Sequence, residues 1–240
     1  MPGTWLVLPT YNEAENIEPL VRAALEQLAT TGPDNHILVV DDGSPDGTGD
    51  IADRLAAEFP AVTVLHRHAK EGLGRAYVAG FTHALGAGAE LVMEMDSDFS
   101  HDPADLPRLI AAAKDADLVL GSRYVPGGGV REWGLVRRFI SRGGSFYARV
   151  ILGLPVRDLT GGFKCFRRST LEKLNLEDVH ADGYGFQIEL TYRAVRAGLK
   201  VTEVPIVFTE RRLGQSKMSA GVALEAIWKV PALRLRRSPD

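Results

Sequence analysis

Short apolar runs alternate with longer segments of helical spacing along the first half of the chain. Each run has the length of a buried strand, and roughly ten to eighteen residues with apolar side chains at helical intervals follow it. Such alternation is typical of βαβ units, in which helices cover both faces of a mostly parallel sheet. It therefore predicts a three-layer α/β fold. The expected strands are 4–9, 36–42, 62–66, 90–95 and 118–122, and the expected helices are 13–30, 48–58, 72–85 and 104–114.

The pattern becomes less regular after Arg123. A glycine-rich loop at 125–129 precedes an amphipathic helical stretch at 133–152, in which aromatic and aliphatic residues lie among arginines. No internal repeat or low-complexity linker divides the chain, so a single domain over 1–240 is expected. The remaining expected elements are a loop and strand at 158–167, a helix at 185–197, a strand at 200–208 and a last helix from about 219.

Charge and composition exclude several classes of protein. The 240 residues carry a net charge of -3, which argues against a general nucleic-acid binder. Residues 123–168 are nevertheless basic, with ten Lys and Arg against two acids, and this arginine-rich segment predicts a local anionic partner. Cys165 has no second cysteine to pair with, which fits a reducing compartment. No apolar run approaches the roughly 18 to 20 residues of a membrane span, and no basic signal-peptide start is seen, so a soluble or peripheral protein is expected.

Polar residues follow five of the expected strands. They are 9–13, Asp41 with Asp42, 66–70, Asp96 to Asp98, and Arg123. Ligands of parallel sheets bind beyond the carboxyl ends of the strands. The sequence therefore predicts one site at this edge of the sheet.

Asp96-Ser-Asp98 ends an apolar run and precedes Pro103, which opens a helical pattern. Two carboxylates at this spacing can converge on a divalent cation, and hard oxygen ligands suit Mg²⁺ or Mn²⁺. The alternative is helix capping, for which Asp and Ser before a proline are ordinary residues. The polar neighbours at the other strand ends favour the metal site, while capping stays open for Ser100 and Asp102.

Two other stretches suggest contacts with a nucleotide. Asp41 and Asp42 can accept hydrogen bonds from a base or a ribose, although turn chemistry in Asp-Gly-Ser-Pro-Asp-Gly would also satisfy them. Gly72-Leu-Gly74 opens a helix whose N–H groups can face a phosphate. The chain lacks the Lys-Ser/Thr of a P-loop and the full Rossmann fingerprint, which argues against an ATPase or a dehydrogenase.

Arginines near the amphipathic helix suggest a second anion. Arg123, Arg137, Arg138 and Arg142 lie on or before this helix, with Ser141 among them. A solvated helix face is the simpler interpretation of any one of them, but the excess of arginine over lysine favours bidentate phosphate binding. Because Trp, Phe and Tyr lie on the same helix, phosphate and lipid tail could be held together at a membrane surface.

Several motifs together resemble a known family. Pro9-Thr-Tyr-Asn-Glu13, Val40-Asp-Asp-Gly-Ser44 and Asp96-Ser-Asp98 resemble family 2 glycosyltransferases of the Rossmann-like GT-A fold. Further motifs are similar to those of polyprenol- or dolichol-phosphate mannose synthases. These are Gly121-Ser-Arg123, Ser141-Arg142-Gly143, Asp158-Leu-Thr-Gly-Gly-Phe163 and Arg211 with Gly214-Gln-Ser-Lys217. The resemblance implies transfer of mannose from GDP-mannose to a polyprenyl phosphate, with inversion and with Mg²⁺ or Mn²⁺.

The resemblance also implies roles for single residues. Donor binding falls to Pro9, Tyr11, Glu13, Asp41, Asp42, Gly72, Asp96, Arg211 and Lys217, with metal binding by Asp96, Asp98 and Ser100. The catalytic set is Asp98, Arg123, Arg137 and Ser141, of which the last three bind the acceptor phosphate. Residues 1–122 would then be the nucleotide-sugar half, and 123–240 the acceptor and membrane-interface half.

A phosphate acceptor is already anionic at neutral pH and needs no general base, unlike a sugar hydroxyl. Glu189 is the best base candidate if a base is used; its alternative is a polar helix residue. Rival functions are a polyprenyl-phosphate glucosyltransferase using a UDP-sugar, a family 2 enzyme with a hydroxyl acceptor, and a non-catalytic scaffold. The expected location is the cytoplasmic face of a membrane, reached through helix 133–152, the last helix or an integral-membrane partner protein.

Overall fold

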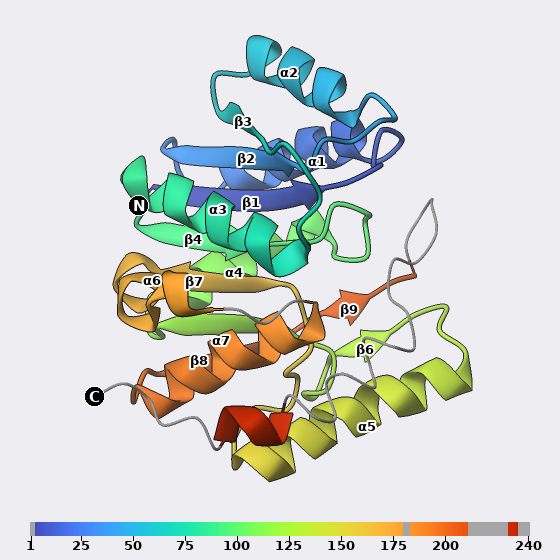
Figure 1. Cartoon of the computed structure of the whole chain (residues 1–240), viewed down its shortest axis with the longest axis vertical. Coiled ribbons are helices and arrows are strands. Elements are labelled where there is room, and N and C mark those ends of the chain that lie inside the picture. Colours follow the sequence, from blue (N-terminus) through green and yellow to red (C-terminus); the bar gives the residue numbers. More distant parts are fainter. Residues whose placement is uncertain (1–2, 180–182, 211–229, 235–240) are drawn as a thin grey trace.

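The computed structural model describes residues 3–179, 183–210 and 230–234. Its centre is a seven-stranded sheet in the order β3-β2-β1-β4-β7-β5-β8, which draws strands from both halves of the sequence (Figure 1). All neighbouring strands are parallel except that β7 runs antiparallel to both β4 and β5. The strands are β1 (Thr4–Thr10), β2 (Asn35–Asp41), β3 (Val62–His66), β4 (Leu91–Glu94), β5 (Leu118–Ser122), β7 (Lys164–Arg167) and β8 (Val201–Pro205).

Helices cover both faces of this sheet. Successive side chains of each strand point to opposite faces, and the apolar ones on both faces must be buried. Trp5 and Val7 of β1 join one hydrophobic core, whereas Leu6 and Leu8 join the other. The first core lies under α3 (Leu73–Gly86), α6 (Arg168–Leu174) and α7 (Tyr184–Arg196), and the second under α1 (Ile17–Ala29), α2 (Thr48–Glu58) and α4 (Leu106–Ala112). The predicted three-layer α/β fold with a mostly parallel sheet is confirmed.

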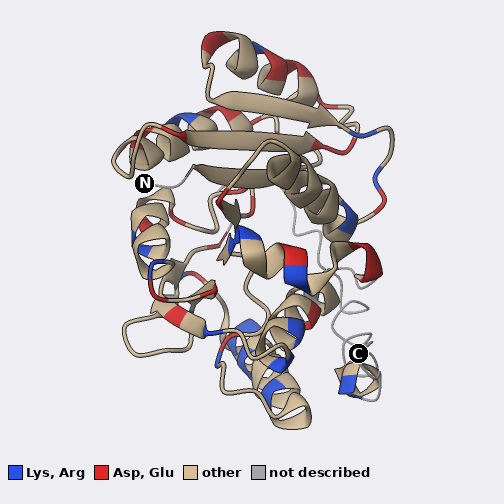
Figure 2. Cartoon of the chain, turned by 90° about the vertical axis from the view of Figure 1, so that its left-hand side faces the viewer, with Lys and Arg blue, Asp and Glu red and all other residues tan. Residues whose placement is uncertain are grey.

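One helix, α5 (Leu135–Leu152), extends beyond the sheet. Ala148 and Leu152 of its C-terminal half join the first core, and positions occupied by Lys and Arg gather along the lower part of the molecule, where α5 lies (Figure 2). A small parallel pair, β6 (Gly129–Val130) and β9 (Val207–Phe208), lies beside it. In the described part of the chain, no helix combines the length and the apolarity that crossing a membrane requires.

Most boundaries agree with the sequence prediction within two residues, and three elements differ in a way that has a structural reason. The helix expected from residue 13 begins at Ile17, because residues 13–16 form a turn in which Asn16 N–H donates to the Glu13 carbonyl. The strand expected at 200–208 is interrupted at Ile206 and forms β8 and β9 in two different sheets. The helix expected at 104–114 is a 3₁₀ turn (Pro103–Asp105) followed by α4. A second 3₁₀ turn spans Leu176–Asp178.

Close packing between α3 and the sheet fixes where the helix begins. A Cβ atom added to Gly80 would lie 2.4 Å from Cγ1 of Val7, which is closer than carbon atoms approach, so only glycine lets α3 pack this closely on β1. The packing places the first turn of α3 at the carboxyl ends of the strands. Gly72 is the N-cap residue of this helix, and its positive φ of 107° is a backbone conformation that favours glycine.

Candidate active site

The two aspartates that follow β4 lie in different surroundings. Asp98 is buried, and its Oδ1 accepts a hydrogen bond of 3.0 Å from the backbone N–H of Ser100. The Asp96 side chain is 32% exposed. Tyr77 Oη lies 3.5 Å from Asp96 Oδ1, and His101 Nε2 lies 3.4 Å from Oδ2. Burial first, and then the neighbouring carboxylates, raise the pKa of Tyr77 well above its ordinary value, so this phenol remains a donor beside Asp96.

These two carboxylates fit a divalent cation whose other positions are filled by water and substrate oxygens. No cluster of three His, Cys, Asp or Glu side chains exists among the residues that the structure describes, so a closed protein cage is not formed there. The backbone at Gly162 approaches Asp96 closely, because a Cβ there would lie only 3.3 Å from Asp96 Oδ1. Mg²⁺ and Mn²⁺ are commonly held by one or two carboxylates together with substrate phosphates.

Helix capping, the alternative for this stretch, applies to Asp102. Its Oδ1 accepts a hydrogen bond of 2.9 Å from the N–H of Ala104 at the start of the 3₁₀ turn. Ser100 contributes its N–H to Asp98 and its carbonyl to Thr209 N–H, so its backbone has a local structural function. Metal binding by Asp96, Asp98 and Ser100 remains a prediction.

The acids that follow β2 have protein partners. The Asp41 carboxylate accepts hydrogen bonds from Thr10 Oγ1 (3.0 Å), Ser44 Oγ (2.5 Å) and Ser44 N–H (3.0 Å), which is the turn chemistry considered as an alternative. Asp42 pairs with Arg67 at 2.5 Å. Burial raises the pKa of Asp42, while the Arg67 charge opposes this shift. Nucleoside contacts by Asp41 and Asp42 therefore remain predictions, and such contacts would have to form beside these existing bonds.

The end of β1 is tied to the aspartates at the end of β4. The Pro9 carbonyl accepts a hydrogen bond of 2.8 Å from Ser97 Oγ, between the two aspartates. The ammonium group of Lys70 lies 4.2 Å from the ring centroid of Tyr11. Glu13 is buried and its Oε2 accepts a hydrogen bond of 2.8 Å from Asn16. The structure thus places Pro9, Tyr11 and Glu13 at the predicted edge of the sheet.

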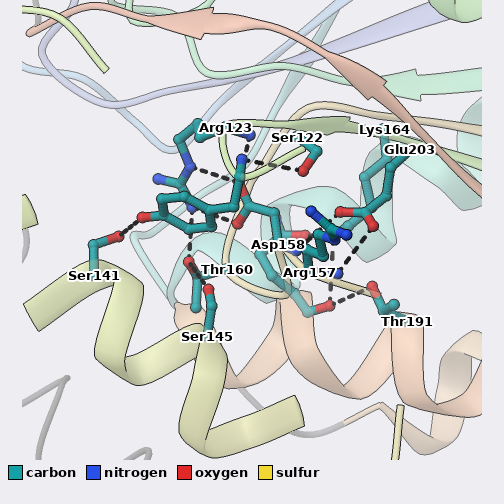
Figure 3. A network of polar contacts seen from close by, with 12 residues as sticks. Ser122, Arg123, Ser141, Ser145, Arg157, Asp158, Thr160, Lys164, Thr191 and Glu203 are labelled. Carbon is teal, nitrogen blue, oxygen red and sulfur yellow. Dashed lines mark hydrogen bonds and ion pairs between the residues drawn. The ribbon is translucent and has the colours of Figure 1, made fainter. Parts of the chain in front are cut away.

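Arg123, predicted to bind the acceptor phosphate, is held by a buried carboxylate. Its Nε donates to Asp158 Oδ2 and its Nη2 to Oδ1, both at 2.7 Å, and its backbone N–H also donates to Oδ2 at 2.9 Å (Figure 3). Nη2 further donates to Thr160 Oγ1 at 2.7 Å. Burial alone would raise the pKa of Asp158, but the Arg123 charge and the hydrogen bonds outweigh it and hold this pKa below its ordinary value.

The structure brings the three predicted acceptor residues together. The guanidinium carbons of Arg123 and Arg137 lie 5.7 and 4.4 Å from the ring of Trp133. Ser141 Oγ accepts a hydrogen bond of 2.7 Å from Tyr124 Oη (Figure 3), and the Tyr124 ring lies 5.2 Å from Arg123. Arg137 also forms an ion pair with Glu210, at the end of the segment before residue 211. Arg211 and Lys217, predicted to bind the donor, lie outside the described residues.

A charged network beneath Asp96 was missed by the sequence analysis. Lys164 of β7 and Glu94 of β4 are both fully buried and pair at 2.9 Å. Lys164 Nζ also donates to Gln187 Oε1 of α7. Burial raises the pKa of Glu94 and lowers that of Lys164, and the attraction between the two charges opposes both shifts. A charged residue inside each apolar run, Leu91-Val-Met-Glu94-Met and Gly162-Phe-Lys164-Cys-Phe, is the signal that could have revealed this pair.

Glu189, the alternative base, faces away from these groups. It lies two residues after Gln187 on α7, which is about 200° around the helix. Its Oε1 accepts hydrogen bonds from Arg193 Nε (3.0 Å) and Nη2 (2.5 Å). Arg193 in turn donates to the carbonyls of Leu174 and Asp178. Glu189 therefore takes part in a buried contact between α7 and the region around α6.

Residues 5–174 match the sequence profile of the glycosyl transferase family 2. The chain belongs to this family. Undecaprenyl-phosphate mannosyltransferase of Micrococcus luteus is 50% identical over 224 residues, which cover 93% of this chain and 90% of the relative. Polyprenol monophosphomannose synthase of Mycolicibacterium smegmatis is 49% identical over 239 residues, which cover 99% and 89%. The resemblance found in the sequence motifs is confirmed.

A solved glycosyltransferase has the same fold. Glucosyl-3-phosphoglycerate synthase of Mycobacterium tuberculosis, solved with Mn²⁺, UDP and glucosyl-3-phosphoglycerate, aligns with a TM-score of 0.73 and 22% identity. The alignment covers 99% of this chain and 81% of that one. Together with the family match, it confirms the predicted GT-A fold.

Removing the carboxylate that holds Arg123 tests the importance of this pair. We expect Asp158→Asn to lower the free energy of unfolding by about 3–5 kcal/mol, because it breaks a buried ion pair on one side only. Urea denaturation at pH 7 measures the change. The matched control is Glu58→Gln, which breaks the half-exposed pair with Arg22 and should leave stability nearly unchanged.

The same pair predicts a dependence on pH. Because the pKa of Asp158 is lower in the folded chain, its contribution is complete above the ordinary carboxyl pKa and is lost as the pH falls through the folded value. The stability gap between wild type and Asp158→Asn should therefore narrow in acid. Equal effects of Asp158→Asn and Glu58→Gln at pH 7 would contradict the assignment.

Proposed function

We propose that this glycosyltransferase transfers mannose from GDP-mannose to a polyprenyl monophosphate, giving polyprenyl-phosphate mannose and GDP. The observation that carries the proposal is the pair of relatives near 50% identity, matched over most of their length, whose names specify mannose and polyprenyl phosphates. The acids and Tyr11 at the strand ends of β1 and β2 would receive the nucleoside. Asp96 and Asp98 would lie at the diphosphate end.

The donor diphosphate would be held with a divalent cation. Asp96 and Asp98 would bind Mg²⁺ or Mn²⁺, and a metal-binding structural neighbour with Mn²⁺ and UDP supports this assignment. When bound, such a cation neutralises charge that develops on the departing diphosphate. The two carboxylates would hold the cation, and the absence of a Cβ at Gly162 keeps this residue from crowding the Asp96 carboxylate.

The acceptor phosphate would lie near Trp133, where Arg123, Arg137 and Ser141 are gathered. A phosphate oxygen attacks the anomeric carbon in line with the departing diphosphate, and the bond from that carbon to the diphosphate oxygen breaks with inversion. Because this nucleophile is already anionic, the main contributions of the protein are positioning and electrostatic stabilisation. Glu189 is buried and ion-paired with Arg193 on the side of α7 away from Gln187, which supports a mechanism without a general base.

A direct assay tests donor, acceptor and metal together. Purified protein is incubated with labelled GDP-mannose and a short polyprenyl phosphate, with and without EDTA. We expect a mannosyl lipid whose formation stops with EDTA and resumes when Mg²⁺ or Mn²⁺ is restored. Competition by GDP but not UDP would separate this function from the UDP-glucose alternative. Product only with a hydroxyl acceptor would overturn the proposal.

The base-free mechanism makes a separate prediction for Glu189→Gln. Loss of a general base typically lowers the rate by about 10²–10⁴-fold, so we expect this variant to keep kcat within about tenfold of wild type. Steady-state kinetics and the GDP-mannose dissociation constant are measured together, with thermal unfolding as the control for the lost contact with Arg193. A loss of several orders of magnitude with normal donor binding would show that Glu189 is the base.

Helix α5 supports attachment to a membrane surface. Phe139, Phe146 and Val150 recur at helical spacing with side chains 81%, 65% and 57% exposed, and Arg138 and Arg142 are exposed among them. An apolar helix face flanked by arginines suits an interface of anionic lipid. We place the protein on the cytoplasmic face of the membrane that holds the polyprenyl phosphate, with an integral-membrane partner as an alternative means of attachment.

Vesicle flotation tests this attachment. We expect the wild-type protein to float with vesicles that contain anionic phospholipid and the triple variant Phe139→Ser, Phe146→Ser, Val150→Ser to stay in the dense fraction. Leu73→Ser removes an exposed apolar side chain from α3 and is the matched control, which should float like wild type. Flotation of the triple variant would assign attachment to another part of the chain or to a partner.

A further inference from the structure

Gln187 lies at an unusual place between the buried ion pair and the candidate donor site. It projects from α7 and is 3% exposed. Its Oε1 accepts a hydrogen bond from Lys164 Nζ, and Lys164 is paired in turn with Glu94. Neither Lys164 nor Glu94 has a direct part in the proposed reaction. Their contact with Gln187 therefore calls for a separate explanation.

The ammonium group of Lys164 decides which way the Gln187 amide faces. An ammonium group has only donors, so the amide presents its oxygen to Lys164 and its NH₂ group to a different neighbour. The Glu94–Lys164 pair thereby fixes the direction of both N–H groups of Gln187.

The NH₂ group is directed toward the space beside Asp96. A Cβ atom on Gly162 would lie 3.4 Å from Gln187 Nε2 and 3.3 Å from Asp96 Oδ1, so the two groups border the same small volume. Gln187 Nε2 is buried and makes no hydrogen bond of normal length to the described residues, although a weaker contact from this amide to the Glu94 carboxylate contributes to lowering the pKa of Glu94 against the effect of burial. A buried donor without a good acceptor is unfavourable, and such groups in native proteins usually have a ligand or water as partner.

We propose that Gln187 is a donor-binding residue whose NH₂ group, oriented by the Glu94–Lys164 pair, donates a hydrogen bond to an oxygen of the hexosyl-diphosphate part of the substrate. The inference rests on the proposed function. A neutral amide suits this place, because a carboxylate there would repel the diphosphate and would compete with Asp96 for a cation. The same hydrogen bond explains why a lysine and a glutamate are buried under the site.

Isothermal titration of GDP and of GDP-mannose tests the inference with two variants. Gln187→Glu keeps an oxygen for Lys164 and removes the NH₂ donors, whereas Gln187→Met keeps the length of the side chain and removes both polar groups. We expect each variant to raise the dissociation constant of GDP-mannose at least about tenfold and to lower kcat/KM at least as much. A parallel loss for GDP assigns the acceptor oxygen to the diphosphate, and normal GDP binding assigns it to the hexose.

Thr191→Val is the matched control. It removes one buried hydroxyl from the same helix, which donates to the backbone carbonyl of Gln187 at 3.0 Å and does not contact the amide. This variant should keep both dissociation constants near the wild-type values. A purely structural role for Gln187 would lower thermal stability in the Gln187 variants and leave both dissociation constants unchanged, which would overturn the inference.

A measurement on the wild-type protein avoids any folding defect of the variants. The side-chain NH₂ signal of Gln187 in a ¹⁵N–¹H spectrum should shift and exchange more slowly with solvent when GDP-mannose binds. An unchanged signal at saturation would also overturn the inference. Failure of the proposed function would appear differently, because the wild-type enzyme would then form no mannosyl lipid.

Discussion

Lys164 and Glu94 carry opposite charges into the middle of the central sheet, at positions that face each other across β7 and β4. Neither charge can be buried alone without a penalty of several kcal/mol, and breaking such a pair on one side typically costs 3–5 kcal/mol. The pair therefore disfavours any shift in the register of β7, because a shift of one residue would turn Lys164 to the opposite face. β7 itself lies between β4 and β5 and is antiparallel to both.

The register of β7 in turn positions the loop that precedes it. This loop, residues 158–163, places Gly162 beside Asp96 at one end and Asp158 beneath Arg123 at the other. Glu203 of β8 secures the beginning of the loop by accepting hydrogen bonds from the N–H groups of Arg157 and Asp158 at 2.9 and 3.0 Å (Figure 3). One short segment thus contacts both the predicted metal end and the predicted acceptor end of the site. A single buried pair accordingly constrains both halves of the proposed reaction.

The sequence was informative where a physical constraint acts locally. The continuous apolar run of β1 and the helical spacing that follows predict a strand and a helix without reference to the rest of the chain. The strand ends could therefore be located, and Pro9, Asp41 and Asp96 fall there. The antiparallel position of β7 could not be predicted in this way, because the four residues Lys164–Arg167 do not specify the direction of the strands beside them. The partner of Arg123 could not be predicted either, because Asp158 lies 35 positions further along the chain.

The same limit applies to the role of single residues. From the sequence alone Glu189 is a plausible general base, because the sequence shows only that a carboxylate lies on a helix near the expected site. Its direction relative to the site depends on how α7 packs against α6, which the local sequence does not encode, although its partner Arg193 is a local i,i+4 neighbour on the same helix. Gln187 was not predicted, because an uncharged amide on a helix gives no signal in the sequence. Its importance comes from its contact with Lys164, which belongs to a different element, β7.

The two arginines near Trp133 differ in how readily they can accept a new anion. The Arg123–Asp158 pair is almost fully buried, so taking the guanidinium from Asp158 would leave a carboxylate in the interior without its cation. The side chains of Arg137 and Glu210 are 41% and 35% exposed, and solvent can compensate either partner when the pair opens. A phosphate can therefore replace Glu210 at Arg137 at little energetic cost. Arg123 is held in place by Asp158 and Thr160, so it would contribute to phosphate binding through the fixed position of its charge.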